Sequence, residues 1–383
     1  MNRNSYIEIS KSAYHKNLAF IKKLIGDQSL FSSVVKGNAY GHGIESFIPL
    51  AESAGVRHFS VFDSHEALRV KKASKDDPGL MIMGWIAPDS FEWIIQSGIE
   101  FFVFDFERLK IAVELAKKLR KKARIHLEIE TGMNRTGFQE IMFRDVFQLL
   151  ERNQAFIELM GICTHLAGAE NIANHYRLMK QIRFFNEFIR DFRNHGFSPR
   201  YIHAACSAGV INYPEIKYNM VRIGILQYGF WPSRETLVQY IGKKTDRNDP
   251  LHRIIQWKTE IMDTKWVGTG EFIGYGTSYM AEQDTRIASI PVGYAHGYSR
   301  SLSNTGRVLV NGQRMGVIGM VNMNMMVIDI TSIPGAKTGD EVVIIGNQGD
   351  LSVSVASFSE LSNQLNYEML TRISSDIPRK IIE

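Results

Sequence analysis

The chain has 383 residues, a formal net charge of +5 and 44% hydrophobic residues. This length exceeds one typical domain, and the composition is that of a chain that folds throughout. No zinc-finger spacing, RNP-like aromatic pattern or basic zipper accompanies the positive charge, so the common nucleic-acid-binding modules are excluded. No segment reaches the roughly 18 apolar residues of a membrane helix, and the first residues lack the apolar core of a secretion signal. We therefore expect a cytoplasmic protein that binds neither nucleic acid nor a membrane.

Cys163 and Cys206 are the only cysteines in the sequence. Two cysteines are too few for a disulfide scaffold or a cysteine-based metal site. Both lie in apolar stretches, which favours inert packing. We expect reduced thiols and no metal site.

The first strand-like segment, "SYIEIS" at 5–10, alternates apolar and polar residues and has no helix before it. From there to about residue 230, short apolar or β-branched runs alternate with longer stretches whose apolar residues recur three and four positions apart. The eight expected strands begin near residues 30, 58, 79, 100, 124, 158, 201 and 220. Eight βα units with nearly continuous apolar strands predict an α/β fold, a TIM-type (β/α)8 barrel.

After about residue 243 the pattern changes to strands without long helices between them. The segment "GKKTDRNDP" at 242–250 is typical of a linker, Asn311-Gly312 of a hairpin turn and 338–350 of a further strand. One helical pattern follows at 356–373. The expected domains are a barrel at 11–242 and a mainly β C-terminal domain of residues 243–383, which the opening segment 1–10 joins.

Polar residues in or just after the expected barrel strands are candidates for an active site, because the catalytic groups of a TIM barrel gather at the carboxyl ends of its strands. These residues are Lys36, Arg135, His165, Ser207, and Arg222 with Gly224. Taken singly, each has an ordinary structural explanation, such as a solvated loop lysine or a hydrogen-bonded core histidine. Five such placements on one rim are unusual by chance.

Lys36 follows the run "FSSVV", which should be buried and would deliver the ammonium into the barrel mouth. A desolvated lysine has a lowered pKa and can form a Schiff base with a carbonyl substrate or with pyridoxal phosphate. Hydroxyl and N–H groups of "CSAG" at 206–209 and "IGI" at 223–225 could hold a phosphate. There is no Walker A lysine and no GxGxxG after the first barrel strand, which weighs against ATP and dinucleotide cofactors.

Eight motifs occur in the order in which one known family carries them. They are "VVKGNAYGHG", "ETGMNRTG", "THLAGAE", "HAACSAG", "VRIGILQYG", "GYGTSY", "PVGYAHGY" and "LNYEMLTRISSDIPR". On these motifs the chain resembles the fold-type III, pyridoxal-phosphate-dependent alanine racemases along nearly its whole length, although the family usually has alanine where Gly37 stands. The resemblance implies the barrel and β-domain that the strand pattern also predicts.

The resemblance implies how the cofactor is held. Lys36 would carry pyridoxal 5′-phosphate as an internal aldimine, and Arg222 would face the pyridine nitrogen. Because a guanidinium can only donate hydrogen bonds, that nitrogen would stay neutral, which favours simple return of a proton over side reactions such as transamination. The residues implied for the phosphate are Tyr40, Ser207, Gly224, Ile225 and Tyr367.

Racemisation needs one base on each face of the substrate α-carbon, and the resemblance implies a lysine and a tyrosine. Lys36 would serve the D-face, and Tyr275 of the partner subunit in a head-to-tail homodimer would serve the L-face. His165, linked to Arg222, would support the tyrosine. Without the resemblance, Tyr275 would be interpreted as an aromatic residue packed in the β-domain.

The resemblance also implies a small amino-acid substrate. Arg135 would bind the substrate carboxylate with its planar fork, and Met323 and Tyr294 of the partner subunit would close the pocket. Alanine is the expected substrate, interconverted between its L and D forms, and D-alanine would serve peptidoglycan synthesis. A serine racemase or a racemase of broad specificity is the alternative.

Besides Gly37, three positions depart from the family pattern. Glu128 stands where many relatives have a lysine that carries CO₂ as a carbamate, so a permanent carboxylate replaces it and no lysine carbamate is expected. Asn324 replaces an acid near the substrate entrance, and His296 replaces an aspartate. These changes bear on substrate choice.

Three other classes remain as alternatives. Fold-type III decarboxylases use an acid at the pyridine nitrogen and a cysteine in the β-domain, whereas this chain has Arg222 and no cysteine after Cys206. The single-barrel pyridoxal phosphate homeostasis proteins are binding modules without a second domain. A catalytically degenerate racemase relative that only binds the cofactor is left open by Glu128 and Asn324.

Overall fold

The protein was analysed as a computed structural model that describes residues 5–242, 244–354 and 366–383. Its residues divide into two compact units. The β unit comprises Met1–Ser12, Gly37–Phe47 and Ile254–Glu383, and the barrel unit comprises Ala13–Lys36 and Ile48–Arg253. The domain boundaries expected from the sequence stay a prediction, with the barrel at 11–242 and the β-domain formed by 1–10 plus 243–383.

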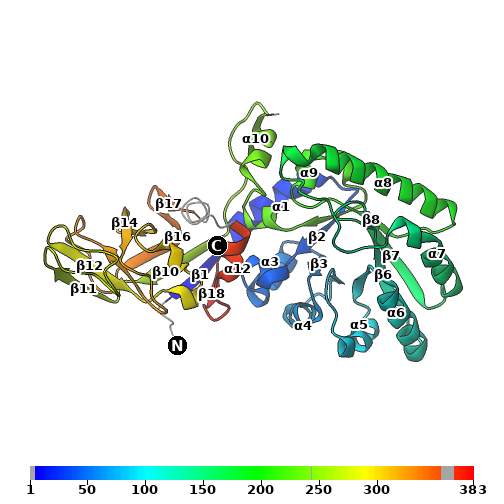
Figure 1. Cartoon of the computed structure of the whole chain (residues 1–383), viewed down its shortest axis with the longest axis horizontal. Helices are drawn as coiled ribbons and strands as arrows, with labels where there is room; N and C mark the ends of the chain where they lie inside the picture. The colour runs from blue at the N-terminus through cyan, green and yellow to red at the C-terminus, as the bar shows by residue number, and fades with distance from the viewer. Residues whose placement is uncertain (1–4, 243, 355–365) are drawn as a thin grey trace. The chain divides into compact units, whose positions relative to one another are not determined.

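The barrel unit contains eight parallel strands, which lie at the positions that the sequence predicts (Figure 1). They are β2 (Leu30–Val34), β3 (His58–Val61), β4 (Gly79–Ile82), β5 (Glu100–Val103), β6 (Ala123–Glu128), β7 (Ile157–Cys163), β8 (Tyr201–His203) and β9 (Met220–Ile223). Each pairs with the next in the chain from β2 to β8, and β2 also pairs with β9. The Arg222 N–H donates to the Ala205 carbonyl oxygen at 3.0 Å, which joins β9 to the residues after β8 and closes the ring. The predicted TIM-type barrel is confirmed.

Helices alternate with these strands, and those from α4 to α8 lie on the outside of the strands in Figure 1. The helices of the chain up to residue 242 are α1 (Lys11–Ile25), α2 (Lys36–Tyr40), α3 (Ile44–Ser53), α4 (Ser64–Ala73), α5 (Phe91–Gln96), α6 (Phe106–Leu119), α7 (Phe143–Arg152), α8 (His175–Asn194), α9 (Gly209–Asn212) and α10 (Arg234–Gly242). The side chains of Asp63 and Asp105 cap α4 and α6 by accepting hydrogen bonds from the N–H groups of Glu66 and Arg108. At both places an aspartate two residues after the end of the strand therefore begins the next helix.

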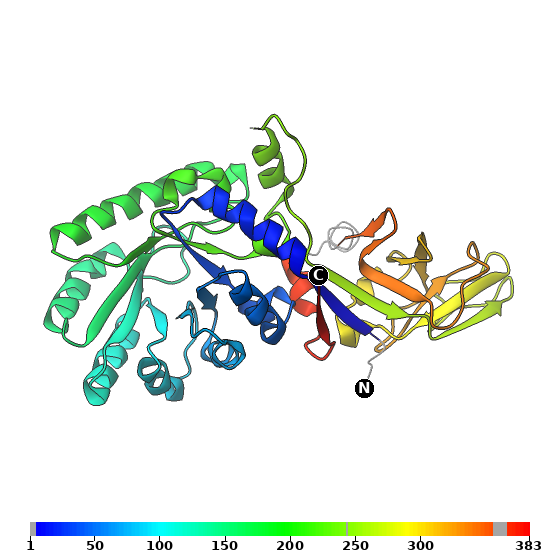
Figure 2. The ribbon, with the colours of Figure 1, turned by 180° about the vertical axis from the view of Figure 1, so that it is seen from behind.

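The β unit is built around a ten-stranded sheet in the described part of the chain. Its strands are β1 (Ser5–Ser10), β10 (Ile255–Glu260), β11 (Asp263–Val267), β12 (Thr285–Ile290), β13 (Arg307–Val310), β14 (Gln313–Ile318), β15 (Met326–Asp329), β16 (Glu341–Gln348), β17 (Leu351–Val353) and β18 (Arg379–Ile382). The strand order is β11-β12-β15-β14-β13-β16-β10-β1-β18, and β17 pairs with β16. Figure 2 shows β1, the blue strand, beside β10, with which it pairs in antiparallel fashion. This C-terminal part is mainly β, as predicted.

Two local predictions in the β unit can be compared with the structure. Asn311 and Gly312 join β13 to β14 with φ values of 50° and 72°, as a two-residue hairpin turn of the primed type requires. The predicted helix at 356–373 corresponds to α12 (Asn366–Arg372) at its C-terminal end, and its first ten residues lie outside the described residues. Across the described ranges, every helix is too short or too polar to cross a lipid bilayer.

The turn after β9 depends on a glycine in the left-handed region. Gly229 has a φ of 85°, and a Cβ atom built on it would overlap the carbonyl oxygen of His252. Gly26 has a similar φ of 74°, but a Cβ there would meet nothing within 4 Å. Comparing an alanine substitution at each of the two positions therefore separates the cost of the backbone conformation from the cost of a steric clash.

We predict that Gly229→Ala lowers the free energy of unfolding more than Gly26→Ala does. Gly26→Ala should cost only the left-handed conformation of an L-residue, about 1–2 kcal/mol. Gly229→Ala should cost about 1–3 kcal/mol more, because the His252 backbone must move. Urea unfolding followed by circular dichroism measures both, and equal losses would contradict the steric argument.

Candidate active site

Seven of the predicted site residues lie in or after barrel strands, towards their carboxyl ends. They are Lys36, Arg135, His165, Ser207, Arg222, Gly224 and Ile225. The parallel order of the strands brings these ends to the same side of the barrel. These seven residues therefore lie towards the same end of the barrel, and their roles in a site stay a prediction.

Lys36 is two residues beyond the end of β2, and its side chain is accessible to solvent. Even so, the surrounding protein desolvates the ammonium and lowers its pKa, and the positive charges of Arg135 and Arg222 lower it further, against the opposing charge of Glu66. A lowered pKa makes more of the lysine a neutral amine at a given pH. Lys36 is thus both reachable and a better nucleophile than an ordinary surface lysine.

The residues after Lys36 form a left-handed turn. Residues 37–40 have φ values of 63°, 55°, 54° and 51°, a conformation that costs an L-residue roughly 1–2 kcal/mol. The Gly41 N–H donates to the Gly37 carbonyl oxygen at 3.0 Å, and the Gly43 N–H donates to that of Asn38 at 2.9 Å. The buried ring of His42 adds to this network, because its Nδ1 lies 2.9 Å from the Ala39 oxygen.

Contacts within the β unit hold this turn in place. A Cβ at Gly41 would overlap the carbonyl oxygen of Leu370 in α12. Arg379 donates from Nη2 to the Gly41 oxygen at 2.8 Å. The rings of Tyr40 and Tyr367 lie 5.9 Å apart between centroids. The two tyrosines predicted to bind a phosphate are therefore neighbours.

Arg222 is almost fully buried in β9, with 5% of its surface exposed. Its Nη1 lies 2.9 Å from His203 Nδ1, and its Nη2 donates to the Thr164 oxygen at 2.8 Å and to the Ala204 oxygen at 3.4 Å. The resemblance implies that His165 is linked to Arg222. The hydrogen-bonded histidine in the structure is His203, and Arg222 acts on His165 through its charge.

His165 follows β7. Burial lowers the pKa of its imidazole to about 3, with further lowering by the positive charges of Arg222, Arg135 and Lys36. The ring is therefore neutral at neutral pH. A neutral imidazole can donate one hydrogen bond and accept another.

Ser207, Gly224 and Ile225 form a small group of hydrogen-bonding atoms. The Gly224 N–H donates to Ser207 Oγ at 3.1 Å, so the serine hydroxyl hydrogen is left to point elsewhere. Ile225 is 1% exposed, and within the described chain its N–H donates to no other protein group. A buried N–H and a hydroxyl hydrogen of this kind suit an anionic oxygen ligand.

Glu128 ends β6 and is buried. Burial raises the pKa of its carboxyl group, while a hydrogen bond from Thr136 and the charges of Arg222 and Arg135 oppose the shift. Both guanidinium groups are therefore within electrostatic reach of Glu128. That Glu128 takes the place of a lysine carbamate beside Arg135 stays a prediction.

The other predicted site residues lie on loops of the β unit. Tyr275, Tyr294 and Met323 are 72%, 41% and 56% exposed. The Tyr294 N–H donates to the Asn322 oxygen at 3.0 Å, which places the loops that carry Tyr294 and Met323 side by side. His296, in the first of these loops, accepts a hydrogen bond at Nδ1 from the Gly293 N–H at 3.1 Å. Their assignment to one site with Lys36 stays a proposal.

His203 and three ionisable residues that continue its hydrogen bonds were not predicted from the sequence; these three are His126, Glu100 and His58. Each is a buried ionisable residue within a barrel strand: "HFSV", "EFFV", "ARIHLE" and "YIH". Ionisable side chains are almost never buried unless they are paired. A polar residue recurring inside buried strands was therefore the signal that could have found them.

Comparisons with known proteins agree with this architecture. Models of the alanine racemase N-terminal and C-terminal domains match residues 9–232 and 254–381. A curated alanine racemase of Leptospira interrogans is 34% identical and covers 99% of this chain and 96% of its own length, and one of Methanococcus maripaludis is 32% identical and covers 98% and 97%. A crystal structure of alanine racemase from Bacillus anthracis with bound L-Ala-P has a TM-score of 0.90 at 30% identity, covering 100% of this chain and 96% of its own. Because the matches span both units at this level of identity, the chain belongs to the alanine racemase family.

Proposed function

We propose that this chain interconverts L-alanine and D-alanine with pyridoxal 5′-phosphate as its cofactor. The observation that carries the proposal is the accessible Lys36, with its lowered pKa, near the buried Arg222 at the carboxyl end of the barrel. Its relatives at 30% to 34% identity are named alanine racemases.

The residues at the barrel mouth fit this cofactor. Lys36 supplies an amine for its aldehyde, and the Ser207 hydroxyl and Ile225 N–H supply donors for its phosphate. Arg222, which can only donate, suits an unprotonated ring nitrogen. When bound, pyridoxal phosphate makes the Cα–H of an attached amino acid acidic by drawing electrons from that carbon.

Two residues, one on each face of the substrate α-carbon, would then move the proton. On the D-face, the neutral amine of Lys36 would take the α-proton, and its ammonium form would return one. On the L-face, the phenolate of Tyr275 would take the α-proton, and its phenol form would return one. Because Tyr275 lies in the β unit, we propose that the site is completed by Tyr275 of the partner subunit in a homodimer, together with Tyr294 and Met323 of the partner subunit.

The remaining residues orient and restrict the reaction. Arg135 binds the substrate carboxylate, and Glu128 positions the guanidinium in place of a lysine carbamate. The pair of Tyr40 and Tyr367 binds the phosphate from the β unit. Arg222 limits how far electrons are drawn into the ring, which favours return of the proton to the α-carbon. A cytoplasmic location and a role in peptidoglycan synthesis stay predictions.

The first prediction for this function is exchange of the α-proton. Purified protein loaded with pyridoxal phosphate should incorporate deuterium from D₂O into alanine and form the opposite isomer. Mass spectrometry with chiral separation measures both, and a panel of L-amino acids that includes serine defines the specificity. Bound cofactor without exchange in any amino acid would contradict the proposal and leave a binding protein.

The second prediction separates the two bases. Tyr275→Phe should keep the absorbance of the bound cofactor and still exchange the α-proton of D-alanine, because Lys36 is intact. Exchange of L-alanine and formation of the opposite isomer should fall by about 10²–10⁴-fold, the usual contribution of one acid–base group. Lys36→Ala should lose the absorbance of the lysine-bound cofactor, and Tyr279→Phe, on the same loop as Tyr275, is the matched control. Undiminished racemisation by Tyr275→Phe would overturn the assignment of the bases.

The third prediction concerns the acidity of Lys36. Its pKa is lowered by burial, Arg135 and Arg222, so the apoprotein should be acetylated at Lys36 at a lower pH than at an ordinary exposed lysine. Competitive labelling across pH with peptide mass spectrometry gives the midpoint. Arg135→Gln should raise that midpoint, because a like charge is removed. Arg57→Gln, at the amino end of β3, should leave the midpoint unchanged. A larger rise of the midpoint in Arg57→Gln than in Arg135→Gln would refute the electrostatic account.

A further inference from the structure

The barrel buries ionisable side chains that the proposed function does not use. His58, Glu100, His126 and His203 come from β3, β5, β6 and β8, and each has no more than 3% of its surface exposed. Burying such groups is costly unless they are hydrogen-bonded. Their partners therefore explain why the barrel tolerates them.

Three of these side chains connect Arg222 to the opposite end of the barrel. Arg222 Nη1 lies 2.9 Å from His203 Nδ1, His203 Nε2 lies 2.9 Å from His126 Nδ1, and His126 Nε2 lies 2.8 Å from Glu100 Oε2. Glu100 is the first residue of β5, at the amino end, whereas His203 is the last residue of β8. We call Arg222, His203, His126 and Glu100 the barrel relay.

Each hydrogen bond of the relay is donated in the same direction, from Arg222 towards Glu100. A guanidinium has no acceptor, so His203 Nδ1 must accept from Arg222 and a neutral His203 carries its proton on Nε2. That proton is donated to His126 Nδ1, which leaves the His126 proton on Nε2 for Glu100. An ionised carboxylate only accepts, so the donor at one end and the acceptor at the other fix both tautomers.

The charge states agree with this direction. Burial lowers the pKa of His203 well below its ordinary value, with the charge of Arg222 adding to the effect, and burial also lowers the pKa of His126. Burial opposes ionisation of Glu100, but hydrogen bonds from His126 and His58 outweigh it and hold the Glu100 pKa below its ordinary value. Two neutral rings thus stand between a cation and an anion.

The barrel makes room for the relay and shields it. A Cβ at Gly161, in β7, would overlap Nδ1 of His126, so only glycine leaves space for that ring. The ring of Phe102 lies 6.0 Å from that of His126 and 5.8 Å from that of His203, and the Arg222 guanidinium lies 5.7 Å from its centroid. Gly161 therefore leaves the space that the His126 ring occupies, and Phe102 packs against both histidine rings.

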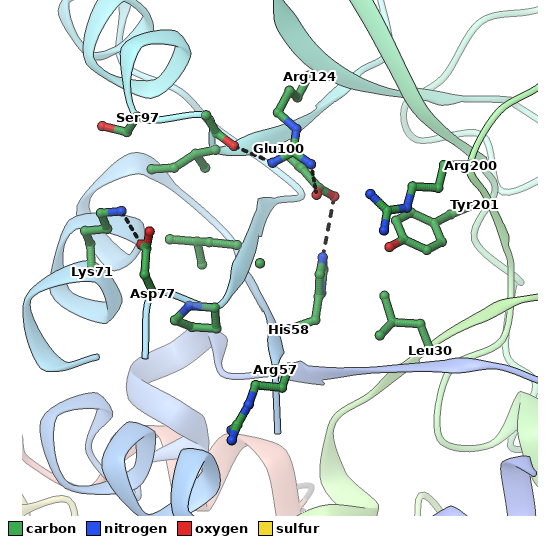
Figure 3. Close-up of a pocket in the computed structure, with 15 residues that line it drawn as sticks. Leu30, Arg57, His58, Lys71, Asp77, Ser97, Glu100, Arg124, Arg200 and Tyr201 are labelled. Atoms are coloured by element: carbon green, nitrogen blue, oxygen red, sulfur yellow. Dashed lines mark hydrogen bonds and ion pairs between the residues drawn. The ribbon is translucent and has the colours of Figure 1, made fainter. Parts of the chain in front are cut away.

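The Glu100 end of the relay faces a cavity of about 350 Å³ at the amino ends of the strands. Figure 3 shows Glu100 between Arg124 and His58. Arg124 Nη2 lies 3.3 Å from Glu100 Oε1, and His58 Nε2 lies 3.4 Å from Glu100 Oε2. The carboxylate is thus anchored by groups outside the relay. In the described part of the chain, no group of three His, Cys, Asp or Glu residues is arranged to hold a metal ion.

We propose that Glu100 is a positioning residue for Arg222, acting through His126 and His203 so that the guanidinium keeps one orientation towards the bound cofactor. His203 and two backbone oxygens take up three of the five Arg222 N–H donors, and the proposal assigns one of the remaining donors to the cofactor ring. Because hydrogen bonds in series polarise one another, the anion at Glu100 also strengthens the bond at His203. This inference rests on the proposed function for the role of Arg222.

Nuclear magnetic resonance of histidine ring nitrogens in the cofactor-loaded protein tests the direction of the relay. His126 and His203 should both be neutral, with the proton on Nε2, throughout the pH range in which the protein is folded. An imidazolium, or a proton on Nδ1 of either ring, would overturn the proposal. This measurement needs no variant of the relay and does not depend on which amino acid is the substrate.

Glu100→Gln tests the positioning role, and Glu158→Gln is the matched control. Both variants remove a carboxylate partner of Arg124, but only Glu100 belongs to the relay. Glu100→Gln should shift the His203 Nδ1 resonance and lower kcat at least fivefold with less than a twofold change in KM, while Glu158→Gln changes neither. Gly161→Ala should disturb the same resonance by displacing His126.

The outcomes separate this inference from the proposed function. A folded Glu100→Gln protein with an unchanged His203 resonance and unchanged kcat would overturn the positioning role, even if the protein racemises alanine. Failure of Glu100→Gln to fold leaves Gly161→Ala and the tautomers of the unaltered protein as the deciding measurements. A protein that shows the predicted tautomers without racemising any amino acid would contradict the proposed function and retain the relay.

Discussion

The positive charge of Arg222 inside the barrel is the constraint on which the candidate site depends. A buried guanidinium is stable only when acceptors meet its donors, and here a histidine and two backbone oxygens do so. The same charge helps to lower the pKa of Lys36 and of His165 and opposes the rise at Glu128. Besides burial, which is the largest cause of each shift, one cation therefore acts on the protonation of groups from three different strands or the loops after them.

Lys36 has a second constraint, which comes from the path of the chain. It is the last residue of a barrel segment, and the left-handed turn of residues 37–40 that follows belongs to the β unit. The contact of Gly41 with Leu370 and the hydrogen bond from Arg379 fix that turn. Lys36 is thus the point in the sequence where the chain passes from a barrel strand into a turn that the β unit holds in place.

Much of this arrangement could be predicted from the sequence, because it follows from local patterns. Apolar runs at a regular spacing identified all eight barrel strands, and Asn311-Gly312 identified a hairpin. The direction of the Arg222 side chain could not be predicted. Its hydrogen bond to His203 depends on how the residues of β8 and β9 face each other in the folded barrel, which no local pattern encodes. The polar residues of the relay are visible in the strand sequences, but the order in which Glu100, His126 and His203 bond to one another depends on the pairing and facing of their strands.

The space that Gly161 leaves for the His126 ring has a consequence for how this barrel can diverge. Replacing His126 by a smaller or apolar residue would empty that space and leave Glu100 and His203 each with an unmatched polar atom. A larger residue at 161 must displace the ring wherever that ring is present. A substitution at any of the positions 100, 126, 161 and 203, which lie on four consecutive barrel strands, therefore changes the packing or the hydrogen bonds on which the other three depend.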